Sequence, residues 1–522
     1  MDVVSNFISE LRNKNLLSSN LGVVSTATIG VLLLLALKYP DRAIFTEHRD
    51  GVPHEKGLPL VGHLFGLLKN KYRIHDFQTD KFVKLDTMTM TMSVLGIPRT
   101  IFTIDPRNVE HVLKTNFENY VKSTWFSECT VHLFGHGILN SNGAQWRWQR
   151  KAASLIFNVK NFRDQFTDVF VDEVEILCNE ILEKAVVSGE AVDLHEHIFR
   201  FTLDSFVYLG FGIQLNSLKT KEEVDFAASF DACQLYSLEK FMNPMIEYTA
   251  IIDRILHPRK KTIKQHIETI DNFSSAVISK RRTELANGGT PNDLLSRFMG
   301  AKNEKDEPLS DKELKDISLN FIIAGRDTTA VALTWVFYCL FNAPEVEKKL
   351  LEEITNCIKD EKKMDSAEIY ETIKNMTYAH AVFYEVLRLY PPVPNNQKYA
   401  LNDDILPDGT HVLKGDNVAW SPYGSSRNKK IWGPDAANFD PERWITLEGN
   451  LRRETQGRWS VFNGGPRVCL GQSFATLEAL VVIIFLFKRY KFTMLPNQDI
   501  TYETSLTLPM KNGLRVKVEK RV

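Results

Sequence analysis

Cys469 has the neighbours that best prepare a residue of this chain for chemistry. It lies between the pair Gly465-Pro466 and Gly471, in a stiff loop whose backbone can approach a bulky partner closely. The apolar run from Phe474 to Phe487 predicts a buried helix directly after this loop. Backbone amides at a helix start favour a thiolate, and a thiolate suits a soft metal ion. Taken alone, the pattern also fits a buried, unreactive thiol, so both interpretations stay open.

An acid and an alcohol interrupt a second apolar stretch. Ser310 and Glu313 have the spacing of a capping box and predict the start of a long helix that ends near Phe341. Asp327 and Thr328 fall in the middle of that helix, between apolar segments on both sides. Burying such groups costs free energy unless they find partners. Hydrogen bonds within the helix would satisfy them, and a functional role is the alternative.

Two further pairs have helical spacing. Trp146 and Arg150 are four residues apart, and Glu385 and Arg388 are three apart, so each pair shares one face of a helix. From the residues alone, the first pair indicates a surface helix with aromatic cover. The second indicates a solvated ion pair of small energetic value.

One large domain has to position these residues. The chain has 522 residues and a formal net charge of −1, which gives no argument for nucleic-acid binding. Its six cysteines are scattered without a C-x-x-C pair, which favours a reducing compartment over a disulfide framework or a zinc site. The patterning predicts a mainly α-helical domain with small β-sheets. Strands are expected at residues 83–85, 87–94, 99–103 and 514–519.

The N-terminal region predicts a membrane anchor. Residues 21–37 carry no charge and, as a helix, would span about 26 Å, close to the endoplasmic reticulum bilayer of about 27 Å. No small-residue cleavage site follows, which disfavours a signal peptide. Lysine and arginine are more frequent after the span than before it, which puts the C-terminal part in the cytosol. We expect a lumenal tail (1–20), a single transmembrane helix (21–37), a linker or hinge (38–62) and a catalytic domain (63–522).

Read together, the motifs resemble those of the cytochrome P450 superfamily. They occur in that family's order: W-x-x-x-R at 146–150, A-G-x-D-T-T at 324–329, E-x-x-R at 385–388, the segment 439–444, and F-x-x-G-x-R-x-C-x-G at 462–471. The resemblance implies a haem-thiolate monooxygenase fold of helices with small sheets. It makes Cys469 the axial ligand on the iron of haem b, with Phe462 packed beside the thiolate. Ala324 stands where relatives with ester-linked haem carry glutamate, so the haem is expected to be non-covalent.

The same resemblance assigns roles to the other motif residues. Haem propionates are expected to contact Trp146, Arg150, Arg467 and Lys398, where lysine stands in place of the family's usual arginine. Thr328 is expected to hydrogen-bond oxygen at the haem, and Asp327 to belong to a proton relay. A structural role, with no chemistry, is expected for Glu385, Arg388 and Arg443.

Within the superfamily, the motifs are most similar to those of fungal members that hydroxylate alkanes and fatty acids. The implied reaction places one oxygen atom on the terminal carbon of a long-chain n-alkane or fatty acid. Electrons would come from NADPH through cytochrome P450 reductase, which carries FAD and FMN. Residues 235–256 correspond to a lid that dips into the bilayer. Candidate substrate contacts are Trp125, Phe126, Phe134, Val393 and Leu506.

Other functions stay open from the sequence. A monooxygenase acting on a sterol, terpenoid or polyketide would carry the same motifs. A haem-thiolate isomerase or dehydratase needs neither oxygen nor a reductase, and a haem sensor needs no proton relay. The intact Asp327–Thr328 pair argues against these last two.

Overall fold

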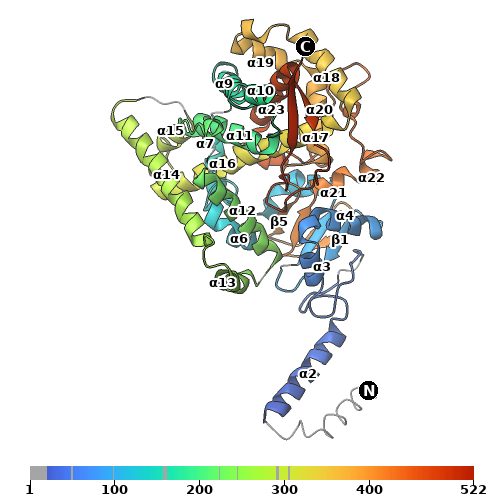
Figure 1. Ribbon diagram of the computed structural model, residues 1–522. Coiled ribbons are helices and arrows are strands. Elements are labelled where there is room, and N and C mark those ends of the chain that lie inside the picture. Colours follow the sequence, from blue (N-terminus) through green and yellow to red (C-terminus); the bar gives the residue numbers. More distant parts are fainter. Residues whose placement is uncertain are drawn as a thin grey trace.

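The computed structural model describes residues 20–48, 51–97, 99–155, 157, 161–220, 222, 224–243, 245–289, 293–303 and 306–521. Helices dominate these residues (Figure 1). In the N-terminal half they are α2 (Asn20–Lys38), α3 (Leu64–Lys69), α4 (Ile74–Lys84), α5 (Pro106–Glu110), α6 (Thr124–Phe134), α7 (Gly143–Ser154), α9 (Thr167–Leu177), α10 (Glu183–Ser188), α11 (Leu194–Phe211), α12 (Asp225–Met242) and α13 (Ile246–Leu256). The later ones are α14 (Ile263–Ala286), α15 (Leu294–Met299), α16 (Asp311–Ile322), α17 (Thr328–Phe341), α18 (Pro344–Cys357), α19 (Ser366–Lys374), α20 (Thr377–Leu389), α21 (Pro422–Ser426), α22 (Lys429–Trp432) and α23 (Gln472–Arg489).

The long helix through the middle of the molecule is built from α16 and α17, joined by a π-helical turn, η7 (Ile323–Asp327). The predicted capping box is confirmed: Ser310 Oγ accepts from the Glu313 amide, and Glu313 Oε2 accepts from the Ser310 amide at 2.8 Å. The predicted end at Phe341 is also confirmed. Position 325 in this turn requires glycine, because a Cβ there would lie 1.9 Å from the Phe206 ring of α11. Two helices thus pack most closely where the backbone leaves regular α-geometry.

The predicted helix after the cysteine loop is α23, and it is buried almost throughout. From Phe474 to Phe487 its side chains join one large apolar core with α9, α11, α17 and α20. Phe474 makes edge contacts with Phe170 and Phe206, and Phe487 stacks on Phe337 of α17. The loop that carries Cys469 is therefore anchored at one end in the most buried part of the fold.

Three small sheets complete the described fold. One has the order β1-β2-β8-β5-β3, a second the order β4-β10-β9, and β6 pairs with β7. The strands are β1 (Thr89–Met92), β2 (Thr100–Thr103), β3 (Tyr120–Val121), β4 (Val192–Asp193), β5 (Asn396–Ala400), β6 (Asp404–Ile405), β7 (His411–Val412), β8 (Asn417–Trp420), β9 (Tyr490–Met494) and β10 (Arg515–Lys520). The mainly helical fold with small sheets is confirmed.

Three of the four predicted strands form, as β1, β2 and β10. The strand expected at 83–85 is wrong, because Val83 and Lys84 end the helix α4. Phe82 is buried and Val83 is exposed, so the alternation there comes from the two faces of an amphipathic helix.

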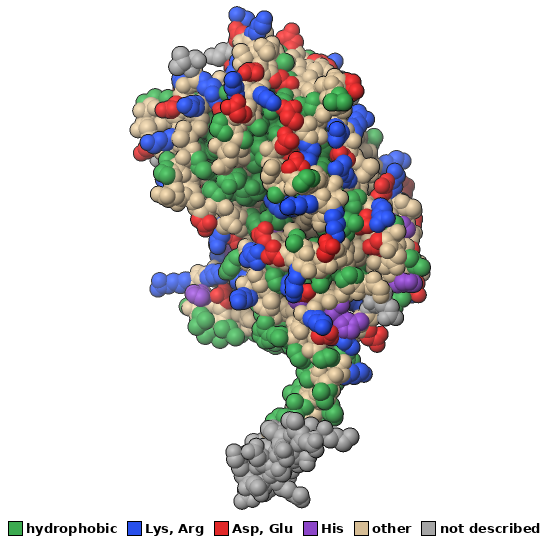
Figure 2. Space-filling view, turned by 90° about the vertical axis from the view of Figure 1, so that its right-hand side faces the viewer, with side chains coloured by type: hydrophobic (Ala, Val, Ile, Leu, Met, Phe, Trp, Pro, Cys, Tyr) green, Lys and Arg blue, Asp and Glu red, His purple; other side chains and the backbone are tan. Residues whose placement is uncertain are grey.

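Helix α2 projects from the body as a stem (Figure 1). Apolar side chains lie on its surface (Figure 2), with Val24, Leu34 and Leu37 among the most exposed. In the portion of the chain that the structure describes, no helix has both the length and the apolar character needed to span a bilayer. The transmembrane helix expected over 21–37 is thus not confirmed, and the tail at 1–19 lies outside the described residues.

The segment expected to be a linker packs against the body. The Ala43 amide donates to Ser93 Oγ at 3.0 Å, and Glu55 accepts from Lys81 at 2.6 Å. The Glu55 amide also bonds to the Thr91 carbonyl of β1. Contacts from both ends of the segment therefore join α2 to the body.

Candidate active site

The Cys469 loop is closed by one backbone bond and one glycine contact. The Cys469 amide donates to the Phe462 carbonyl at 2.8 Å, which brings these two predicted site residues together. Gly465 has φ +57°, and a Cβ there would lie 2.0 Å from the Leu113 carbonyl oxygen. A larger residue would push the loop off its support. The loop thus presents Cys469 three residues before α23 begins at Gln472, as predicted.

Cys469 as a residue keeps exposed surface, although its sulfur is largely enclosed by the surrounding protein. Its surroundings raise the pKa of Cys469, because removal from water outweighs the Gly471 amide and the positive charge of Arg150. The Gly471 amide at the helix start favours the thiolate as predicted, but its effect is smaller than the opposing effect of burial. A bound metal cation is what would stabilise the ionised sulfur here.

Four cationic side chains gather beside this loop. Arg467 donates to the Ser141 carbonyl at 2.9 Å, and its guanidinium lies 4.3 Å from the Trp146 ring centroid. Arg150 approaches the same ring at 6.0 Å. Lys398 is 1% exposed, and its Nζ has no hydrogen-bond partner in the described structure. The predicted residues Trp146, Arg150, Lys398 and Arg467 thus share one region, although they come from three distant parts of the chain.

Lys122 is the fourth cation, and the sequence motifs missed it. Burial, and to a smaller extent the charge of Arg467, lower the pKa of Lys122 to about 7. The pKa of Lys398 is held well below its usual range by burial and then by Lys122 and Arg467. Burial and Arg150 lower the pKa of Arg467 to about 10. Such mutual repulsion indicates a binding site for an anion.

No carboxylate among the described residues compensates this cluster of cations. Among the described residues, Lys122, Arg150, Lys398 and Arg467 form no ion pair, although other arginines in the fold do. Buried charges in proteins are normally paired. A ligand with two negative groups would supply the missing charge.

The π-helical turn buries the predicted acid and leaves the predicted alcohol partly exposed. Ala324 is accessible where its neighbours in the helix are buried, and Thr328 Oγ1 donates to the Ala324 carbonyl at 2.7 Å. Asp327 is 1% exposed and accepts a hydrogen bond from Gln234 of α12 at 2.8 Å. Burial raises the pKa of Asp327 to about 7, against the opposing charge of Arg326. A group that titrates there can both give and take a proton at neutral pH.

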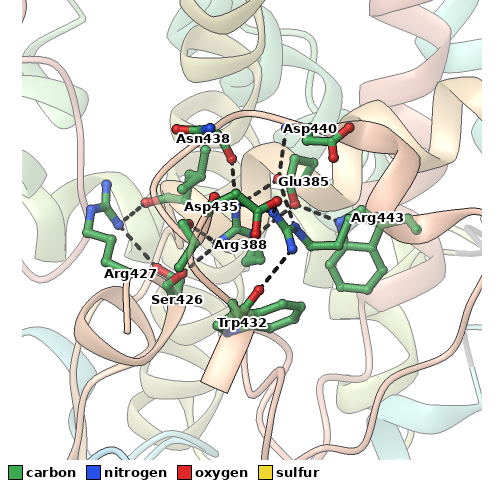
Figure 3. A network of polar contacts seen from close by, with 12 residues as sticks. Glu385, Arg388, Ser426, Arg427, Trp432, Asp435, Asn438, Asp440 and Arg443 are labelled. Carbon is green, nitrogen blue, oxygen red and sulfur yellow. Dashed lines mark hydrogen bonds and ion pairs between the residues drawn. The ribbon is translucent and has the colours of Figure 1, made fainter. Parts of the chain in front are cut away.

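The expected structural network is present around Glu385 (Figure 3). Arg388 donates to both carboxylate oxygens of Glu385 at 2.7 Å, and both side chains are fully buried. Arg443 lies 3.5 Å from the same carboxylate. Arg388 also donates to the backbone carbonyls of Ser426, Ala436 and Asn438. The network joins α20 to the segment ahead of the cysteine loop.

Comparison with known proteins identifies the family. The cytochrome P450 family model matches residues 52–516. The chain belongs to the cytochrome P450 family. It is 37% identical to cytochrome P450 704C1 of Pinus taeda over 89% of this chain and 92% of that protein. It is 34% identical to cytochrome P450 monooxygenase cyp1 of Mycosarcoma maydis, over 94% and 79%. It is also 33% identical to cytochrome P450 94A2 of Vicia sativa, over 94% and 96%. The protein is therefore a cytochrome P450 monooxygenase, an oxidoreductase of class EC 1.14.

The residues of this P450 fit the haem that the family carries. Cys469 is exposed, and the described residues contain no group of three or more His, Cys, Asp or Glu side chains that could hold a separate metal ion. Two propionates would supply the negative charge that the four cations lack. When bound, a thiolate-ligated haem supplies oxygen activation with electrons from a redox partner.

Among the predicted substrate contacts of the P450, Phe126 and Leu506 pack against the main apolar core. Trp125 and Phe126 of α6 pack near Phe241 of α12, with ring centroids 6.4 and 5.7 Å apart. Phe134 is buried in the main core. Val393 and Leu506 are both half-buried. The family resemblance supplied these candidates, and a single sequence carries no signal for the shape of the cavity.

Proposed function

We propose that this P450 hydroxylates the terminal carbon of long-chain n-alkanes or fatty acids. It would take electrons from NADPH through a reductase that carries FAD and FMN. One observation carries the chemistry: an exposed Cys469 beside four cations that have no carboxylate partner among the described residues. The substrate class rests on the resemblance of segments 324–329 and 462–472 to those of fungal alkane- and fatty-acid-hydroxylating P450s.

The proposed roles follow from the geometry. Cys469 ligates the iron of a non-covalent haem b, and Phe462 stays beside it through the backbone bond that closes the loop. The propionates contact Arg467 and Lys398, with Lys122 added to the residues expected from the motifs. Trp146 stacks under the Arg467 guanidinium and holds it in place.

Protons are proposed to pass through the helix on the other side of the site. Asp327 would hold the proton, and Thr328 would donate a hydrogen bond toward the oxygen site. Thr328 Oγ1 now donates to Ala324 within its own helix, so a rotation about its χ1 torsion would redirect it. The accessible Ala324 methyl leaves room for a ligand on this face.

We propose a single-pass attachment to the endoplasmic reticulum membrane through α2, with the catalytic domain in the cytosol. The exposed apolar side chains of α2 support attachment to lipid. Helix α13 adds a second exposed apolar set, consisting of Tyr248, Ile251, Ile252, Ile255 and Leu256. Removing residues 1–38 should release the protein from microsomal membranes, and full retention of the truncated protein would contradict the proposal.

The test of the reaction is turnover by the purified holoenzyme with reductase and NADPH. Dodecane, lauric acid and oleic acid are supplied separately, and products are separated by gas chromatography with mass detection. Terminal alcohols formed with consumption of oxygen support the proposal. Conversion of sterols, terpenoids or polyketides alone would reject the substrate class, and isomerised or dehydrated product without oxygen uptake would reject the reaction.

A further inference from the structure

Arg326 is a buried arginine that serves two carboxylates. It lies in the π-helical turn directly before Asp327. Its guanidinium donates to both oxygens of Asp231 on α12, at 2.6 and 3.2 Å. The same Nη1 atom lies 3.0 Å from Asp327 Oδ1. The Asp231 side chain is 53% exposed, whereas that of Asp327 is 1% exposed. One positive charge is thus shared between a carboxylate open to water and one enclosed by protein.

Helix α12 also supplies the other contact of Asp327. Gln234, three residues after Asp231, donates to Asp327 Oδ2 at 2.8 Å. Residues three apart share one helical face, so Asp231 and Gln234 approach the π-helical turn together. Asp327 Oδ1 accepts no hydrogen bond in the described structure, so Arg326 acts on it through charge.

The charges around Asp327 act in opposite directions. Arg326 lowers the pKa of Asp327, whereas burial and Asp231 raise it, and the result is a pKa of about 7. His195 of α11 is the other titratable group near this pair, and burial lowers its pKa to about 4. His195 is therefore neutral at physiological pH. Arg326 and Asp231 are the two charged groups that act on Asp327 there.

We propose that the Arg326–Asp231 pair is a positioning device for proton transfer, which fixes the direction of the Asp327 carboxyl and divides one positive charge between that carboxyl and α12. Arg326 is then a positioning residue that acts through Asp327. The inference rests on the proton-relay role proposed for Asp327. In each transfer Asp327 gives up one proton and regains one from solvent, so the pair itself is unchanged.

The two charged partners should shift the pH profile in opposite directions. Arg326→Gln removes the opposing positive charge, so the apparent pKa of turnover should rise by about one unit or more. Asp231→Asn leaves the guanidinium to Asp327 alone, so the apparent pKa should fall. Both are measured with the holoenzyme, reductase, NADPH and lauric acid, together with the peroxide released per NADPH consumed. The pair acts on proton transfer, so kcat should change more than KM.

A second readout does not depend on turnover. Infrared difference spectra of each protein against its Asp327→Asn counterpart, recorded from pH 5 to 9, follow the protonated Asp327 carboxyl band. The band should titrate in the same order as the activity profiles. If no alkane or fatty acid is turned over, the proposed substrate fails while this titration still decides the role of the pair.

Matched variants separate charge from structure. Arg326→Lys keeps the positive charge and should stay within about half a unit of the wild-type midpoint. Arg282→Gln removes an arginine from an exposed pair with Asp311 and should leave the profile unchanged. Shifts of Arg326→Gln and Asp231→Asn in the same direction would overturn the proposal, as would no shift in either. Should Arg326→Gln fail to fold, the half-exposed Asp231→Asn decides alone.

Discussion

Two groups of cations, one around the buried Arg388 and one around the buried Lys398, differ in how their charge is compensated. Arg388 donates two hydrogen bonds to Glu385 and further hydrogen bonds to three backbone carbonyls. Lys398, by contrast, has no partner for its Nζ, and its cationic neighbours meet no carboxylate in the described structure. A compensated charge stabilises the fold, whereas an uncompensated charge marks where a ligand of opposite charge binds. The comparison separates scaffold from site without reference to any motif.

Replacing the sulfur should have the largest effect on the uncompensated side. Cys469→Ala removes the thiolate ligand, so we expect complete loss of the red-shifted Soret band of the reduced carbon monoxide complex and of hydroxylation. The Cys357→Ala variant, at an exposed cysteine of α18, serves as the control and should keep both. A Cys469→Ala protein that retained the band would disprove the assignment of the ligand.

The compensated side should fail by unfolding. Glu385→Gln leaves Arg388 buried without an acid, which should lower the free energy of unfolding by about 3–5 kcal/mol. The measurement is urea denaturation followed by circular dichroism. The matched control is Glu442→Gln, which breaks an exposed pair with Lys349 and should cost about 0–1 kcal/mol. Equal losses in both variants would remove the distinction between the two groups of cations.

Removing an uncompensated cation should have opposite effects with and without haem. Lys398→Met takes away a charge that the protein alone does not pair, so we expect the apoprotein to gain about 1 kcal/mol of stability. The holoprotein should lose affinity for haem by roughly tenfold, because one propionate contact is lost. Haem transfer to apomyoglobin measures the affinity. A Lys398→Met apoprotein less stable than wild type would show that the Lys398 ammonium has a stabilising partner within the protein.

The smallest effect is a pH dependence confined to the apoprotein. Lys122 has a pKa of about 7 in the folded chain, below the value of about 10.4 for a free lysine. Between these values the unfolded state binds more protons, so apoprotein stability should rise as pH increases from about 7 to about 10. Lys122→Met should flatten this slope. Denaturation midpoints across that range check it, and a slope equally steep in the holoprotein would contradict charge compensation by the propionates.

Local patterns predicted the parts of the fold that depend on near neighbours. The capping box at Ser310, the buried helix after Cys469 and the helix carrying Glu385 all follow from spacings within a few residues. Strands β5 and β8 escaped prediction because polar residues such as Asn396, Lys398 and Asn417 occupy them. Their pairing joins segments about twenty residues apart, which local propensity does not encode.

The same distinction between local patterns and long-range contacts holds for the candidate site. The motifs supplied Cys469, Arg467, Asp327 and Thr328, and the structure places each where the loop and the long helix were expected. Lys122 belongs to no sequence motif. It is a candidate site residue only because the fold brings it near Arg467. The contact of Arg326 with Asp231 likewise joins residues 95 positions apart. Side-chain pairing over such distances depends on the tertiary fold, which spacing alone does not give.

The contacts of Ala43 and Glu55 with the body have a mechanical consequence. Because Ala43 and Glu55 are hydrogen-bonded to the body, the segment between α2 and the body is fixed in place and is not a flexible linker. A membrane or protein surface that binds α2 would therefore also fix the orientation of the catalytic body relative to that surface. A mutation at Ser93 or Lys81, outside the candidate active site, would remove one of these contacts and allow the catalytic body to change its orientation relative to α2.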